Sequence, residues 1–180
     1  MPDPATPIPV FPSLPGRALR ALPLAPVSLS LTAYASSVAK HHPGLFRRLG
    51  EHANARYVLD PTDLPMVLVL EPRGGQPKVT ATRKPGAHDA RIAGPLAALL
   101  GLMHGAYDGD ALFFSRDLVI EGDTAAALAL RNAIDDAELD FSEELTRLSG
   151  PFARPLKRLV ALAERRTGVS LSRSEEALLW

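Results

Sequence analysis

Short apolar runs bounded by turn residues recur between positions 56 and 93. Runs of this length, rich in β-branched residues and flanked by Gly or Pro, are typical of β-strands. Gly74 and Gly75 lie between the second and third runs, where glycine can supply the positive φ angles of a tight hairpin turn. The pattern predicts strands at 56–59, 66–71, 78–82 and 88–93, with the first three antiparallel.

Apolar residues with a helical period lie on both sides of these strands. A first helix is predicted after Pro26 and is broken by Pro43 and Gly44, which are followed by a second, short helix. Pro95 suits the first turn of a third helix that runs to about His104. The apolar positions are Val27, Leu31, Tyr34 and Val38 in the first helix, Leu45, Phe46 and Leu49 in the second, and Leu96, Leu99, Leu100 and Met103 in the third.

The stretch from Asp110 to Asp140 predicts a strand that leads into a helix. Leu112–Phe114 and Leu118–Ile120 are of strand length, and Glu121-Gly122-Asp123 ends the second run. Asp123 can accept hydrogen bonds from the first turn of an Ala-rich helix over 124–137. The whole pattern predicts an α+β fold with one mixed or antiparallel sheet of about five strands, covered by helices.

These residues resemble the sterol carrier protein type 2 family of lipid-binding domains, and within it the bacterial ubiquinone-biosynthesis accessory factors of the UbiT (YhbT) subfamily. The resemblance is carried by Leu112-Phe113-Phe114 and by Leu118 to Thr124, followed by Asn132, Asp135 and Glu138. It is dense over 87–140, loose over 26–84 and absent elsewhere. Ala125-Ala126-Ala127 departs from the pattern, so that these small side chains either widen a lipid cavity or pack closer to the sheet.

The resemblance implies an apolar lipid tunnel between sheet and helices, with further helices at both ends of the chain. A long polyprenyl chain needs apolar walls more than polar motifs, because each buried methylene contributes about 0.8 kcal/mol. An ordinary core role is the alternative for each expected wall residue. The expected lipid-binding residues are Leu99, Leu100, Met103, Phe113, Phe114, Leu118, Ile120, Leu130 and Ile134.

The amino-acid composition excludes several classes of function. The 20 basic residues balance the 20 acidic ones, so the chain lacks the basic excess of a nucleic-acid binder. Cysteine is absent, which excludes disulfides, thiolate nucleophiles and thiolate metal sites within the chain. No apolar run approaches the roughly 20 residues that a membrane-spanning helix needs.

Both ends of the chain differ from its middle. Six prolines in the first 15 residues predict an extended or disordered tail. After Pro151, an amphipathic helix is predicted with Arg154, Arg158 and Arg165 opposite its apolar face, and it either docks on its own domain or meets an anionic membrane or partner surface. We therefore divide the chain into a tail (1–25), a lipid-binding domain (26–141) and a helical extension (142–180).

The sequence contains no convincing catalytic or metal motif. His41 and His42 point in different directions on a helix, and Pro43-Gly44 interrupts regular spacing to His52, so we do not interpret them as zinc ligands. No nucleophile elbow, P-loop or dinucleotide fingerprint occurs. We expect no enzyme, no metal and no cofactor, and we interpret Asp123 as a helix cap.

The leading hypothesis is a non-catalytic lipid carrier. From the resemblance, its cargo would be an isoprenoid quinone, a precursor or a phospholipid. Its partners would be other ubiquinone-biosynthesis proteins, and the subfamily implies the oxygen-independent pathway. The resemblance implies a cytoplasmic location. Peripheral contact with the inner membrane and formation of a homodimer are left open. The alternatives are a scaffold subunit that carries no lipid and an enzyme without a recognisable motif.

Overall fold

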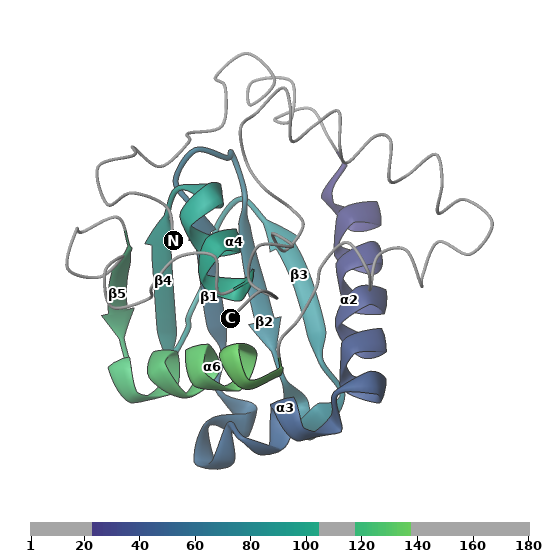
Figure 1. Cartoon of the computed structure of the whole chain (residues 1–180). Coiled ribbons are helices and arrows are strands. Elements are labelled where there is room, and N and C mark those ends of the chain that lie inside the picture. The colour runs from purple at the N-terminus through teal and green to yellow at the C-terminus, as the bar shows by residue number, and fades with distance from the viewer. Residues whose placement is uncertain (1–22, 105–117, 138–180) are drawn as a thin grey trace, which may run out of the picture.

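The computed structural model describes residues 23–104 and 118–137, with the side chains of 101–104, 136 and 137 left aside. Five strands form one sheet, and helices lie against it (Figure 1). The strands are β1 Tyr57–Pro61, β2 Val67–Glu71, β3 Lys78–Thr82, β4 Ala90–Gly94 and β5 Val119–Gly122. The helices are α2 Leu24–His41, α3 Pro43–Arg47, α4 Leu96–His104 and α6 Thr124–Ala137, and the short 3-10 helices are η2 Gly50–Asn54 and η3 Arg73–Gly75.

The sheet is mixed, with the strand order β3-β2-β1-β4-β5. The first three strands pair antiparallel, as predicted, and the turn between β2 and β3 has positive φ at Gly74 and Gly75. β4 then crosses to the far side of β1 and pairs with it in parallel, and β5 pairs antiparallel with β4. The prediction of an α+β fold on a mixed sheet of about five strands is confirmed.

The register gives the sheet two chemically different faces, because successive side chains of a strand point to opposite sides. We call the side covered by helices the helix-side face and the other side the opposite face. The helix-side face carries Tyr57, Leu59, Leu68, Leu70, Val79, Ala81, Ile92 and Ile120. The opposite face carries Val58, Asp60, Val67, Val69, Thr80, Thr82, Arg91, Val119 and Glu121.

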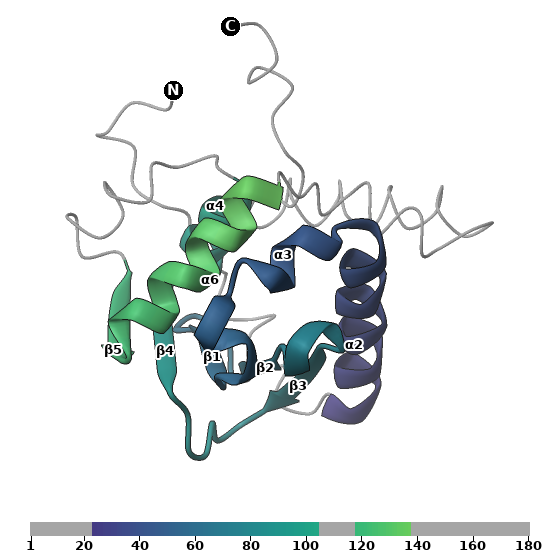
Figure 2. The same cartoon turned by 90° about the horizontal axis from the view of Figure 1, so that it is seen from below.

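Helices α3, α4 and α6 lie on the helix-side face, and α2 runs along the β3 edge (Figures 1 and 2). The largest cluster of buried side chains lies between these helices and the sheet. It joins Tyr34, Val38, Leu45, Phe46, Leu49, Tyr57, Ile92, Leu99, Leu118 and Leu130, together with small alanines. The opposite face has a smaller buried cluster of Val58, Val67 and Val69.

The predicted elements agree with the structure to within a few residues. The helix predicted over 124–137 is α6 with the same ends, and the first helix begins at Leu24, two residues before Pro26. The strand predicted at 88–93 begins at Ala90 instead. Asp89 precedes it, and its carboxylate accepts a hydrogen bond from Arg56 N. The strand predicted at Leu112–Phe114 and the C-terminal helix lie outside the described residues.

Two hydroxyl groups of α2 bind the backbone of the edge strand β3. Thr32 Oγ1 accepts a hydrogen bond from Val79 N at 3.0 Å and donates to Val79 O at 2.9 Å. One helical turn earlier, Ser28 Oγ accepts from Ala81 N at 2.9 Å. The spacing fits because four residues of helix rise about 6 Å and two residues of strand about 6.8 Å. Helix α2 therefore supplies hydrogen-bond partners to backbone groups of Val79 and Ala81 on this edge strand, as a neighbouring strand would.

We expect Thr32→Val, which keeps the side-chain shape, to lower the free energy of unfolding by about 1–3 kcal/mol, since the amide and carbonyl of Val79 lose their partner. Urea denaturation measures the change. Ser30→Ala, at an exposed position of the same helix, serves as the control and should leave stability nearly unchanged. Equal stabilities of the two variants would contradict the proposed role of Thr32.

Candidate lipid-binding face and the junction that supports it

The helix-side face of the sheet presents apolar side chains that the helices cover only in part. Leu59, Leu68 and Leu70 lie on the central strands β1 and β2, yet all three are only half-buried, and so is Val79 on β3. Leu59 and Leu70 pack against the edge of the main core cluster, whereas Leu68 is outside it. Accessible aliphatic groups in the middle of a covered sheet face form a surface on which a lipid chain can be buried.

The structure brings together most of the predicted lipid-binding residues that it describes. Leu99, Leu118 and Leu130 are buried in the main core cluster, and Ile120 and Ile134 are half-buried against it. Leu100 is also buried, but it packs with Ala97 and Leu96 in a separate cluster. Leu100 therefore does not join the others, because neighbouring residues of a short helix point to different sides. Phe113, Phe114, Arg154, Arg158, Arg165 and the side chain of Met103 lie outside the described residues.

Sequence reasoning missed the leucines of β1 and β2. The run Val67 to Leu70 is apolar at every position, so its sequence gives no alternation that separates one face from the other. The pairing of Leu59 with Leu68 shows which side of the sheet Leu68 faces, because paired residues point to the same face and Leu59 lies on the helix-side face. The signal that could have found them is the polar Asp60 beside Leu59, which marks the alternation on the partner strand.

Helix α6, which covers part of this face, is fixed by the tight junction Gly122-Asp123. Gly122 has φ +81°, and a Cβ built on it would lie 2.3 Å from the carbonyl oxygen of Asp89. Asp123 Oδ1 accepts hydrogen bonds from Ala125 N and Ala126 N at 2.9 and 3.0 Å. The interpretation of Asp123 as a helix cap is confirmed, and Gly122 supplies the positive φ of the tight turn before it.

Gly122→Ala is expected to lower the free energy of unfolding by more than about 2 kcal/mol, because it combines a positive φ with a collision against backbone. Gly44→Ala is the matched control, since its added Cβ meets nothing within 4 Å. The control should be neutral or slightly stabilising in helix α3. Thermal or urea unfolding compares the two, and similar midpoints would refute the close approach at Gly122.

A polar group of side chains lies below this junction. The Tyr57 hydroxyl donates to the His52 carbonyl oxygen at 3.1 Å, and His52 Nδ1 lies 3.7 Å from Asp123 Oδ2. Burial raises the pKa of Tyr57 to about 12, with smaller contributions from the charges of Asp123 and Asp89. The hydroxyl is thus held neutral and committed to the backbone, which suits anchoring of η2 to β1 and not proton transfer.

The raised pKa of Tyr57 predicts a loss of stability in strong alkali. A folded-state pKa of about 12 against the ordinary 10.0 favours the protonated form, so the contribution is full below pH 10 and disappears as the pH rises toward 12. Tyrosinate absorbance during an alkaline titration should include a late step from Tyr57. In Tyr57→Phe this late absorbance should be smaller and the loss of stability between pH 10 and 12 shallower; an undiminished late step would assign it to another tyrosine.

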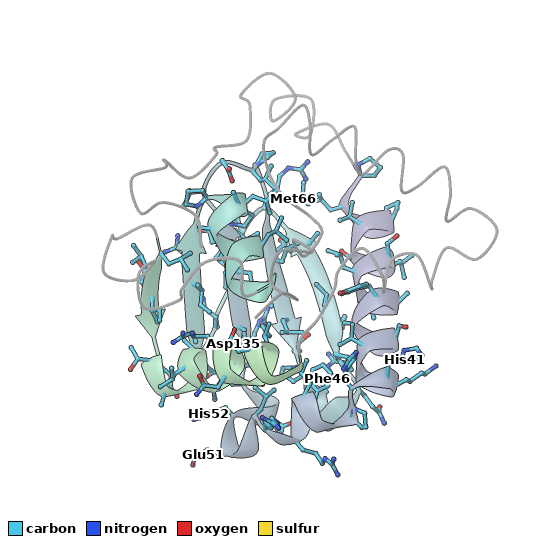
Figure 3. All side chains as sticks on the ribbon, viewed as in Figure 1. His41, Phe46, Glu51, His52, Met66 and Asp135 are labelled. Carbon is cyan, nitrogen blue, oxygen red and sulfur yellow. The ribbon has the colours of Figure 1, made fainter. Side chains whose placement is uncertain are left out.

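The histidines considered as metal ligands are far from forming one site. His41 lies at the end of α2, where its Nδ1 is 2.9 Å from the Ser37 carbonyl, and His52 lies below α6 beside Glu51 (Figure 3). Within residues 23–104 and 118–137, no three His, Asp or Glu side chains gather closely enough to hold a metal ion.

Two hollows lie among the described residues, and neither contains a predicted lipid-binding residue. The larger, about 540 Å³, opens on the opposite face of the sheet. The smaller, about 440 Å³, lies between α2, α3 and the two 3-10 helices and is lined by Phe46, Arg47, three glycines and small residues. The accessible leucines of the helix-side face are therefore a surface separate from both hollows.

The fold and its apolar helix-side face are those of a small lipid-carrier domain. The sequence model of the SCP-2 sterol transfer family matches residues 39–135, more than half of the chain, and the protein belongs to this family. No curated protein sequence matches the chain significantly. None of the described helices is long and apolar enough to cross a membrane.

The structure is similar to solved structures, and at a TM-score above 0.5 the likeness shows the same fold. The ubiquinone synthesis protein UbiJ-SCP2 is 19% identical, with a TM-score of 0.55 over 66% of this chain and 98% of that one. The apo form of sterol carrier protein 2 from Yarrowia lipolytica is 15% identical, with a TM-score of 0.47 over 62% of this chain and 92% of that one.

Proposed function

We propose that this protein is a non-catalytic lipid-binding accessory factor of ubiquinone biosynthesis. Its cargo is an isoprenoid quinone intermediate or a phospholipid, held between the helix-side face and the helices and presented to the enzymes that modify it. The observation that carries the proposal is the incomplete burial of Leu59, Leu68 and Leu70 in the centre of that face.

The chemistry of the helix-side face supports a carrier. Among its described strand residues, Tyr57 alone has a polar side-chain group, and that hydroxyl is bound to the His52 carbonyl. Aliphatic walls hold a hydrocarbon chain at about 0.8 kcal/mol per buried methylene without a specific polar contact. A cargo with a long prenyl or acyl chain suits this wall better than a compact polar substrate does.

The pathway part of the proposal draws on family membership, a structural relative and a sequence resemblance. The chain belongs to a family of sterol transfer domains, and one of its structural relatives is a ubiquinone synthesis protein. The resemblance of Leu118 to Thr124 to the UbiT subfamily adds the oxygen-independent pathway. The composition of the two ends supports a division into tail (1–25), lipid-binding domain (26–141) and extension (142–180). Other ubiquinone-biosynthesis proteins and a membrane surface are then the proposed partners.

Leu68→Trp is expected to reduce bound lipid at least about threefold, because the indole fills accessible space above the sheet. The full chain is purified from quinone-producing cells, and native mass spectrometry and organic extraction identify and quantify the lipid. Leu128→Trp, at a half-exposed position on the outer side of α6, is the control and should keep the wild-type amount.

Repeated recovery of wild-type protein without any lipid would overturn the carrier and favour a scaffold subunit. Lipid that is retained equally in Leu68→Trp and Leu128→Trp would remove the helix-side face as its site. Recovery of a phospholipid without any quinone would fix the cargo and exclude the isoprenoid.

A further inference from the structure

The larger hollow lies on the opposite face of the sheet, away from the proposed lipid site. The connection between β3 and β4 crosses this side (Figure 2), and its Arg83 and Pro85 form one wall. Leu64, Pro65 and Met66 form another wall, and Met66 lies just before the start of β2 (Figure 3). Val67, Asp60 and Arg91 complete the lining. At about 540 Å³ the hollow has the size of small-molecule sites.

An ion-pair chain crosses the strands that form the floor of this hollow. Arg91 Nε and Nη2 donate to Asp60 Oδ2 at 3.0 and 2.5 Å, and Nη1 donates to Glu121 Oε2 at 2.5 Å. Asp60 and Arg91 keep 19% and 26% of their side-chain surface exposed. Because both bonds to Asp60 end on Oδ2, its Oδ1 stays available as an acceptor beside Arg91, whose five N–H donors are only partly used.

The charged groups of this hollow favour a neutral ligand that can both donate and accept a hydrogen bond. Arg91 is paired with both Asp60 and Glu121, so its charge attracts a further anion only weakly. A carboxylate acceptor next to a guanidinium donor instead matches a hydroxyl, which donates to one and accepts from the other. The remaining walls are proline rings, a thioether and aliphatic groups, which suit a flat apolar ring.

We propose that this hollow is a second binding site, for a neutral small molecule in which an aromatic ring carries a hydroxyl group. The ring lies between Pro65, Met66 and Pro85, and the hydroxyl meets Asp60 Oδ1 and Arg91. The site is separated from the helix-side face by the sheet itself, and it does not rest on the proposed lipid cargo.

Phenol and anisole test the site as a matched pair of probes, since the methyl ether keeps the ring and loses the hydroxyl donor. Titration of the ¹⁵N-labelled full chain should shift the amide signals of Met66, Val67 and Arg91 with phenol. Anisole should bind about tenfold more weakly, in line with the loss of a hydrogen bond to a charged group. Equal affinities, or no shifts with phenol, would overturn the proposal.

Leu64→Trp fills the hollow from its loop wall and should abolish the phenol shifts while lipid retention stays at the wild-type amount. Leu68→Trp, whose residue points to the helix-side face, should do the reverse. Phenol shifts that persist in Leu64→Trp and vanish in Leu68→Trp would assign phenol to the lipid face and refute a second site. If Leu64→Trp does not fold, the position of the wild-type shifts still decides between the two faces.

Discussion

Asp89 lies where the starts of β1, β4 and α6 and the end of β5 meet, and the geometry of the helix-side face depends on it. Its carboxylate accepts from Arg56 N at 2.7 Å just before β1, and its own N–H donates to the Arg56 carbonyl at 2.9 Å. Its carbonyl accepts from Asp123 N at 2.8 Å, where β5 ends and α6 begins. That carbonyl can be approached so closely only because residue 122 has no Cβ. Asp89, which lies outside every described strand, therefore fixes where helix α6 begins on the helix-side face.

The two faces of the sheet differ because every strand obeys the same alternation. Asp60, Arg91 and Glu121 fall together on the opposite face, where their ion pairs join β1, β4 and β5 across the sheet. Such pairs keep their charges partly hydrated at 19–54% exposure, which limits the desolvation cost of placing them on a packed sheet. The same register leaves the helix-side face without a charge among its described strand residues. An apolar helix-side face and a polar opposite face thus arise from one pattern of alternation.

Local signals in the sequence were sufficient for most elements but not for their arrangement in space. The Asp cap and Ala-rich run predicted both ends of α6, and Gly74-Gly75 predicted the turn after β2. The crossing of β4 to the far side of β1 depends on pairings between residues 30 or more positions apart, such as Tyr57 with Ala90, which no local pattern encodes. Leu99 and Leu100 could not be assigned to separate clusters for another reason: every residue from Leu96 to Leu100 is apolar, so the sequence does not show which side of the helix faces the main core.

The alanines at the start of α6 set how closely that helix packs on the sheet. Ala126 and Ala127 are fully buried in the main cluster, at 0% and 1% exposure, so their small side chains bring the helix close to the sheet instead of widening a cavity there. Leu130 and Ala133 continue this buried side, whereas Ile134 is only half-buried. A helix that is pinned by Asp123 and packed closely through its first turns leaves accessible apolar surface toward its later turns. In the proposed site, the accessible apolar surface therefore extends from the half-buried leucines of β1 and β2 toward Ile134 and not toward the closely packed Gly122 junction.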